Sequence, residues 1–345
     1  MKFVQVCIGF ITLCLVFYVL RVGSHLLLPL VMAVLIWFII NMLKSFYASA
    51  SFHGRHLPAA VCFLLAIGTI ALALYFLYEL ISANVSSLIE EAGGYNDKLR
   101  EIIRHWFQVF HITETPELSK IIKNINFGSV VAEIAKALTN MAGRIGIVFI
   151  YLLFLFLEQA SFKLKLNALF SDTNNHQKVF TILNEISRDV RTYFGIKTLT
   201  SAVTGIYSYL IMQSLGLDFA AFWALLIFFM NFIPTIGSIV ATIFPSILAL
   251  IQFDSFVPFA IIAGGITGLQ FLIGNLLEPK LMGTTLNISP LVILLSLAFW
   301  GIIWGIPGMI LCVPIVVISL IVCSHFPTTR PIAIMLSGNG KIDEH

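Results

Sequence analysis

The sequence predicts an all-α polytopic membrane protein, and three observations support that prediction. Residues of the set AVILMFWYC make up 59% of the 345 residues and only 11% are charged, whereas an ordinary soluble domain has about 45–50% apolar and about 25% charged residues. The mean hydropathy is +0.98. About eight hydrophobic segments follow one another along the chain. So few charges cannot cover a water-facing surface, which excludes a soluble enzyme, and a net charge of +3 is too small to indicate a nucleic-acid partner.

About six of the segments are long enough for a full transmembrane helix, which needs about 20 predominantly apolar residues. They are 3–20, 26–43, 57–80, 141–158, 194–213 and 256–275. The first segment is not followed by a small-residue cleavage site, so we expect it to be retained as a helix. The cysteines lie in or at the end of apolar runs without metal-ligand or disulfide spacing, so neither a metal nor another cofactor is expected.

Two further apolar stretches, 219–253 and 289–323, are too long for one crossing and too short for two crossings with a loop. Each is interrupted near its middle, the first by Pro234 and Gly237, the second by Pro307 and Gly308. Proline removes a backbone donor and glycine allows a sharp reversal. We therefore expect each stretch to form two half-helices in a re-entrant hairpin, which is tolerated where protein or water surrounds the break. A long, kinked single helix is the alternative.

Basic residues in short loops predict orientation, because Lys and Arg are retained on the cytoplasmic side. The loop after the second span and the connection 159–192 are both basic, so we expect both of them, and both termini, in the cytoplasm. Their basic residues are Lys44, Arg55, Lys163, Lys165, Lys178, Arg188 and Arg191. The segment 82–140 carries no positive excess and is expected outside. The chain is thus divided into transmembrane helices 1–3 (1–81), an extracytoplasmic helical insert (82–140), the fourth helix with a cytoplasmic connection (141–192), a transport core (193–325) and a cytoplasmic tail (326–345).

Two of these parts have apolar residues at helical spacing. In 82–140 the pattern predicts amphipathic helices that pack on the membrane domain, with a partner-docking module as the alternative. In the cytoplasmic connection, the stripe from Val179 to Phe194 predicts an amphipathic helix that leads into the next span. Tyr193 and Lys197 are expected to anchor that helix at the membrane interface, and attraction of an anionic substrate is the weaker interpretation.

The second half of the chain repeats one order of segments. The span 194–213 precedes the broken stretch 219–253, and the span 256–275 precedes the broken stretch 289–323. Entered from opposite sides, the two units would have the inverted topology common in secondary transporters. Paired broken segments point to a binding site near the membrane midplane.

Polar residues gather at the breaks and between the two units. Because buried polar groups tend to face a cavity and mark a pathway, the candidate pathway residues are Asn231, Pro234, Thr235, Gly237, Ser238, Asn275, Glu278, Pro307 and Gly308. For Asn231 and Asn275, hydrogen bonding between spans is an equally good interpretation. Glu278 is expected to cap or tether its loop, with a proton or sodium site as the alternative, and Lys280 lies two residues further on.

Three blocks at these positions resemble one known family. They run from Asn231 to Ser238 (NFIPTIGS), from Gly274 to Gly283 (GNLLEPKLMG) and from Phe299 to Gly308 (FWGIIWGIPG). They are similar to the autoinducer-2 exporter family of PerM/TqsA-like permeases, which also carries a tyrosine and a lysine where Tyr193 and Lys197 stand. The order of spans agrees over nearly the whole chain, although the N-terminal third matches only in hydropathy.

The resemblance implies an inner-membrane exporter of small polar molecules, with the quorum-sensing signal autoinducer-2 as the best-known substrate. It also implies a homo-oligomer, with a pentamer as the expected form, and an elevator-like motion of the hairpin unit. Some members resemble sodium/proton antiporters, which makes a cation/proton antiporter with a titrating Glu278 the first alternative. A scaffold that docks a partner through 82–140 is the second alternative. An enzyme is disfavoured, because the sequence has no H-E-x-x-H, G-x-x-x-x-G-K-[ST] or G-x-S-x-G motif.

Overall fold

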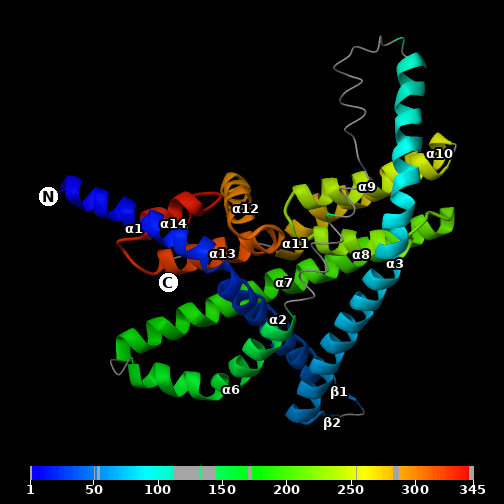
Figure 1. Cartoon of the computed structure of the whole chain (residues 1–345). Coiled ribbons are helices and arrows are strands. Elements are labelled where there is room, and N and C mark those ends of the chain that lie inside the picture. Colours follow the sequence, from blue (N-terminus) through cyan, green and yellow to red (C-terminus); the bar gives the residue numbers. More distant parts are fainter. Residues whose placement is uncertain are drawn as a thin grey trace. The chain divides into compact units, whose positions relative to one another are not determined.

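In a computed structural model of the chain, the residues that the structure describes are almost entirely helical (Figure 1). The structure describes residues 2–49, 51–52, 55–109, 111, 133, 145–169, 173–253, 255–282 and 287–341. The described helices are α1 (Lys2–Val22), α2 (Ser24–Ser49), α3 (Ala59–Val109), α6 (Ile145–Leu169), α7 (Thr173–Leu215), α8 (Ala220–Met230), α9 (Ile236–Gln252), α10 (Phe256–Leu272), the π-helix η1 (Ile273–Leu277), α11 (Glu278–Met282), α12 (Pro290–Trp304), α13 (Ile306–Ser324) and α14 (Arg330–Leu336). Strands β1 (Ser51–Phe52) and β2 (Arg55–His56) pair antiparallel between α2 and α3. The predicted all-α class is confirmed.

The chain divides into two compact units. Unit 1 contains residues 1–67, 144–196 and 280–345, and unit 2 contains residues 68–143 and 197–279. The helices α3 and α7 each contribute residues to both units. Each unit is described by itself below.

Four of the described helical segments are long and apolar enough to cross a membrane. They are Ser24–Ser49, Ala59–Leu80, Phe256–Met282 and Ile306–Ser324. The first three of these segments overlap the expected spans 26–43, 57–80 and 256–275. The fourth differs from the prediction, because the sequence predicts only half a span at α13. The protein is therefore a multi-pass membrane protein.

The other expected spans have different outcomes. The segments 3–20 and 141–158 correspond to shorter apolar helices at Cys7–Val22 and Ile145–Gln159. The segment 194–213 lies in the second half of α7. Lys197 and several hydroxyl side chains lower the hydropathy of this segment, so it is not one of the four helical segments that are apolar enough to cross a membrane.

Both broken stretches form two helices that fold back on each other. In unit 2, the rings of Trp223 on α8 and Phe244 on α9 stack with centroids 6.2 Å apart, and Figure 1 shows the two helices running side by side. In unit 1, the Ser296 hydroxyl on α12 donates to the Cys312 carbonyl on α13 over 3.2 Å. Each contact joins residues at similar distances from the break, so the chain reverses there. That the chain enters and leaves the membrane on the same side at each hairpin stays a prediction.

A glycine at the start of each second helix makes these reversals tight. A methyl group on Gly237 would lie 1.7 Å from the Met230 carbonyl oxygen, and one on Gly308 would lie 2.1 Å from the Trp300 carbonyl oxygen. Real Cβ contacts are never so short, so only glycine fits at either position. The same device thus closes both hairpins, although their turns differ in sequence.

The turn of the first hairpin also contains a strained residue. Thr235 has φ 60° and ψ −59°, a region that β-branched residues disfavour. The Ile236 amide donates to the Pro234 carbonyl over 2.6 Å, so Thr235 is the centre of a γ-turn of the rarer, positive-φ kind. The second hairpin turns at Gly305 with φ 65°, where glycine carries no such strain.

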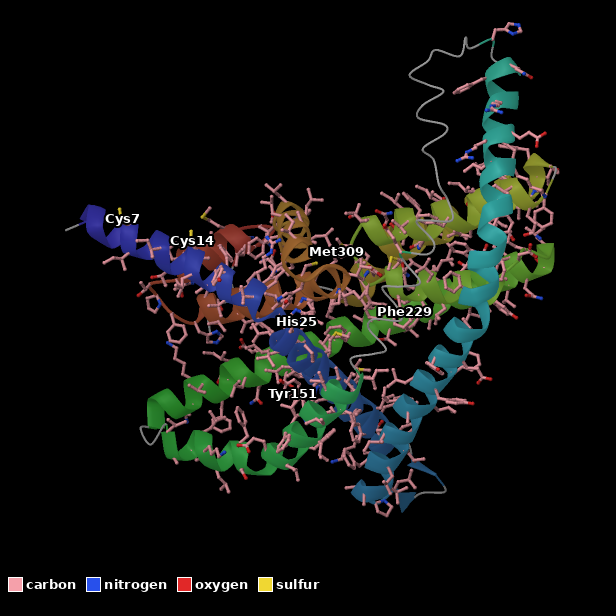
Figure 2. The ribbon with its side chains drawn as sticks, in the orientation of Figure 1. Cys7, Cys14, His25, Tyr151, Phe229 and Met309 are labelled. Carbon is pink, nitrogen blue, oxygen red and sulfur yellow. The ribbon has the colours of Figure 1, made fainter. Side chains whose placement is uncertain are left out.

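A core cluster in unit 1 joins the first helices to the second hairpin. Leu28, Trp304 and Leu311 form a buried group, and the Trp304 indole donates to the Leu20 carbonyl of α1 over 3.1 Å. Met309, which Figure 2 labels, packs against Gly301 of α12. A Cβ added to Gly301 would lie 2.9 Å from the methyl carbon of the Met309 side chain. These contacts hold α1, α2, α12 and α13 together.

The structure adds detail within three of the expected parts of the chain. The third span continues without a break as α3 to Val109, so the first part of the insert 82–140 is helical, while most of 110–144 lies outside the described residues. The cytoplasmic connection and the following span form one continuous helix, α7. The segment expected to be a tail contains α14, and the Gly338 amide beyond it donates to the Asn287 side chain over 3.1 Å.

Candidate functional site

The candidate site begins with the hydroxyl side chains along one face of α7 in unit 2. Thr200, Ser201, Thr204 and Ser208 are fully buried, each with 0% exposure. Thr200 and Ser201 are adjacent and the other two follow at intervals of three or four residues, so all four lie within about 100° of the helix circumference, on one side of an α-helix. Membrane helices present polar side chains to a protein interior or a cavity and not to lipid. This face of α7 is therefore a buried polar face within unit 2.

The tip of the α8–α9 hairpin contacts this face. Asn231, the residue after α8, is 7% exposed, and its amide donates to the Thr204 hydroxyl over 3.1 Å. The Thr204 hydroxyl in turn donates to the Thr200 carbonyl over 2.8 Å. Gly205 allows this approach, because a Cβ there would already lie 3.2 Å from the Ala224 carbonyl oxygen of α8.

One turn earlier on α7, an ion pair continues the line of polar contacts. The Lys197 ammonium lies 2.7 Å and 2.8 Å from the two carboxylate oxygens of Glu278. The Thr200 hydroxyl lies 3.1 Å from the first of these oxygens. Exposure of the two charged side chains is only 12% and 15%, so both charges are largely removed from solvent and neutralise each other. Glu278 therefore tethers the end of the helix formed by α10 and η1 to α7.

A π-helix places Glu278 at this position. Pro279 has no amide hydrogen to donate to the Asn275 carbonyl, so the regular ladder is interrupted there. The Glu278 amide instead bonds to the Ile273 carbonyl, five residues earlier. Such π-bulges are frequent at functional sites.

The other predicted pathway residues of unit 2 lie away from these contacts. Asn275 is exposed and donates to the Phe271 carbonyl of its own helix. Thr235 is exposed and Pro234 half-buried in the turn, while the Ser238 hydroxyl bonds to the Thr235 carbonyl. Gly237 shapes the turn, as described above. Their role as pathway residues stays a prediction.

Four further candidates belong to unit 1. Pro307 is at the start of α13 and Gly308 closes the second hairpin. Lys280, just after Pro279, is exposed. Tyr193 is 2% exposed and packs edge-on against Phe194 with ring centroids 5.4 Å apart, so its side chain is buried, and its role as an anchor stays a prediction.

Sequence reasoning missed the hydroxyl side chains of α7. Thr and Ser are common in membrane helices, where they bond back to their own backbone. A signal was nevertheless present, because Lys197, Thr200, Ser201, Thr204 and Ser208 recur at three- and four-residue spacing within an apolar span. That pattern predicts one polar face. Among the described residues, no group of three or more His, Cys, Asp or Glu side chains could hold a metal ion.

The chain is similar in sequence to bacterial transport proteins. A protein of Borreliella burgdorferi is 33% identical over 263 residues, which are 74% of this chain and 70% of its own. A protein of Haemophilus influenzae is 29% identical over 289 residues, 82% of this chain and 83% of its own. Both carry the name "Putative transport protein". The AI-2 transport protein TqsA of Escherichia coli is 38% identical over 152 residues, 44% of each chain.

The family description matches far more of the chain than that last relative does. The AI-2E family transporter description covers residues 8–327, which include both hairpins, α7 and the Lys197–Glu278 pair. The description names transport as the activity of this family. The chain belongs to the AI-2E family of transporters.

Proposed function

We propose that this transporter is a secondary exporter of a small polar metabolite, with autoinducer-2 as the first candidate substrate, and that it works by alternating access. The observation that carries the proposal is the buried line of contacts from Asn231 through Thr204 and Thr200 to the Lys197–Glu278 pair. A polar solute leaving water for a membrane protein needs such groups, because unpaired polar atoms are costly in an apolar interior.

The hairpin tip supplies the part of this line that can move. Asn231 follows α8 directly, and one side-chain hydrogen bond joins it to α7. In alternating access, the Asn231 amide would release the Thr204 hydroxyl, bind a hydroxyl of the solute, and return to Thr204 after the solute leaves. Broken helices at a midplane site are the usual arrangement in secondary transporters.

The substrate is argued from charge as well as from the relatives. Lys197 and Glu278 neutralise each other, and the other groups of the line are hydroxyls and one amide. An uncharged solute with several hydroxyl groups matches these partners, and a charged solute would lack a counter-charge. The name of the Escherichia coli relative TqsA supports autoinducer-2. We also propose the bacterial inner membrane, cytoplasmic termini and a homo-oligomer, with a pentamer as the expected form.

A cation/proton antiporter is the alternative, with Glu278 as the titrating group. The contacts of Glu278 favour a tether, because Lys197 and Thr200 occupy its oxygens. The test is transport by Glu278→Gln between pH 6 and pH 8. Loss of transport together with loss of pH dependence would favour the antiporter. An unchanged pH profile of transport would contradict the antiporter alternative.

A scaffold is the second alternative, and deletion within the insert tests it. If docking through 82–140 were the whole function, shortening the insert would abolish the phenotype, while Asn231→Ala and Thr204→Val would leave it intact. We expect the two hairpin-contact variants to lose activity.

The main experiment measures autoinducer-2 released by cells that lack their own exporters and express this chain. Asn231→Ala and Thr204→Val each remove one hydrogen bond at the tip, and we expect about fivefold slower release at equal membrane abundance. Thr181→Val is the matched control. Thr181 also lies on α7, but it is exposed, and its hydroxyl donates to the Gln177 carbonyl of the same helix. Release by wild type no faster than by empty vector would refute autoinducer-2 as the substrate.

A further inference from the structure

Two buried serines of α7 have hydroxyl groups that the contacts described so far do not use. Ser201 and Ser208 are 0% exposed, and among the described residues neither hydroxyl has a hydrogen-bond partner. Other helix serines of the described chain have a partner: Ser246 bonds back to the Thr242 carbonyl, Ser319 to the Ile315 carbonyl, and Ser296 reaches a carbonyl of a neighbouring helix. Ser201 and Ser208 differ from these serines, because among the described residues their buried hydroxyls are left without a partner.

A third such atom lies on the helix that runs antiparallel to α7. The Gln270 amide nitrogen is buried and has no partner among the described residues. Glu278 contacts α7 at Lys197, and Gly265 faces α7 at Ile211, where an added Cβ would lie 2.9 Å from the Ile211 side chain. Gln270 lies between these two levels on one continuous helix.

The neighbours of Gln270 indicate which face it occupies. Ile262, Ile266 and Ile273 of the same helix are 0%, 0% and 4% exposed, and Gln270 follows Ile266 by one helical turn. The amide therefore lies on the buried face of α10, level with the hydroxyl face of α7. Polar atoms from two different helices are thus left without described protein partners along one stretch of unit 2, in which Ser201 and Ser208 lie about 10 Å apart along α7.

We infer that Ser201, Ser208 and Gln270 form an internal hydrogen-bonding site in unit 2 that holds the hydroxyl groups of a neutral guest. Buried polar atoms in native proteins are nearly always satisfied, and an ordered molecule supplies the partner when the protein does not. The guest is neutral because two hydroxyls and an amide offer no counter-charge. Water and the hydroxyls of the transported solute share this chemistry.

The site goes beyond the hairpin-tip contacts of the proposed function and rests on that function only for the identity of a solute guest. Ser201 and Ser208 lie on α7 on either side of Thr204, each about one turn from it. Gly205, between the two serines, keeps α8 close to this stretch of α7. The site therefore extends the polar line along α7 past the contact with Asn231.

The test uses single cysteines at Ser201 and Ser208 in the full chain, with the native cysteines replaced. A thiol reacts with a hydrophilic methanethiosulfonate only as thiolate, which forms in water and not in a dry apolar core. Met212→Cys is the control, because Met212 is also 0% exposed and lies one turn beyond Ser208. We expect both serine positions to react on the order of tenfold faster than position 212. Equal, slow reaction at all three positions would overturn the inference.

Adding autoinducer-2 as the probe distinguishes the two guests. Slower labelling in its presence identifies the solute as the guest, and unchanged fast labelling identifies water. Fast labelling in a protein that exports no autoinducer-2 would refute that substrate and leave the site standing.

A stability measurement covers the case in which the cysteine variants do not fold. If the hydroxyls were truly unpaired, the double variant Ser201→Ala, Ser208→Ala would raise the melting temperature by about 2–4 °C, because unpaired buried hydroxyls destabilise. We expect no rise, since alanine would remove hydrogen bonds to the guest. A rise of that size would overturn the inference.

Discussion

The Lys197–Glu278 pair gives the sharpest prediction about what holds unit 2 together. Lys197→Met leaves the Glu278 carboxylate, which is 15% exposed, with only the Thr200 hydroxyl as its described partner. The gross attraction at 2.7 Å is about 6 kcal/mol at an effective dielectric constant of about 20. Desolvation offsets much of this, and removing one partner of a buried pair costs about 3–5 kcal/mol. That loss is a large fraction of a typical folding free energy of about 5–15 kcal/mol.

The double variant Lys197→Met, Glu278→Met removes both charges and should be close to wild type in stability. Replacing a buried ion pair by apolar residues of similar size is often neutral or stabilising. A double-mutant cycle, measured as the unfolding free energy of purified protein in detergent, should therefore give a coupling of about 3 kcal/mol or more. The Lys165–Glu158 pair is the control, because its side chains are 62% and 52% exposed and such pairs contribute about 0–1 kcal/mol.

Additive single effects, each below about 1 kcal/mol, would refute this reasoning, because they would mean that water reaches the pair. Transport by the double variant then separates structure from chemistry. Full transport would assign the pair a tethering role, and a folded double variant without transport would assign Glu278 a further role in the pathway.

Three further substitutions test the hairpins and the core of unit 1. Gly237→Ala should destabilise the protein by about 3 kcal/mol or more in a thermal unfolding assay and abolish transport, because the added methyl group would meet a backbone carbonyl at 1.7 Å. Gly264→Ala is the control, because an added Cβ there has nothing within 4 Å. It should be neutral or slightly stabilising in the same assay. Thr235→Gly should raise the unfolding free energy by about 1 kcal/mol, because glycine adopts φ 60° without strain, and a decrease would contradict the strain argument. Trp304→Phe should lower it by about 1–3 kcal/mol through loss of the indole hydrogen bond to α1, and no change in the melting temperature would show that the bond does not contribute.

The breaks in the two apolar stretches could be predicted because their causes are local. Proline cannot donate a helix hydrogen bond, and glycine alone tolerates a backbone oxygen at the distance found for Gly237 and Gly308. Both properties belong to the residue itself, whatever surrounds it. The continuous amphipathic helix that leads into the second half of α7 could be predicted for the same reason, since its apolar spacing is local too.

The partners of the polar residues could not be predicted in this way. Lys197 and Glu278 are 81 residues apart, and Asn231 and Thr204 are 27 apart. A helical pattern gives the face of each residue and leaves open which helix covers that face. Asn231 and Asn275 looked equivalent in sequence, and yet Asn231 is buried against α7 while Asn275 bonds to its own helix.

The sequence by itself determined that the chain is a multi-pass helical membrane protein, where its apolar stretches break, and which family it resembles. The first two features follow from composition and from the backbone chemistry of single residues, and the resemblance rests on the three sequence blocks quoted above. Only the tertiary structure decided that Glu278 is held by Lys197, that the hairpin tip meets Thr204, and that Ser201 and Ser208 are buried in the same unit. The physical reason is that a hydrogen bond or ion pair depends on two surfaces meeting, and the packing of helices distant in sequence sets which surfaces meet.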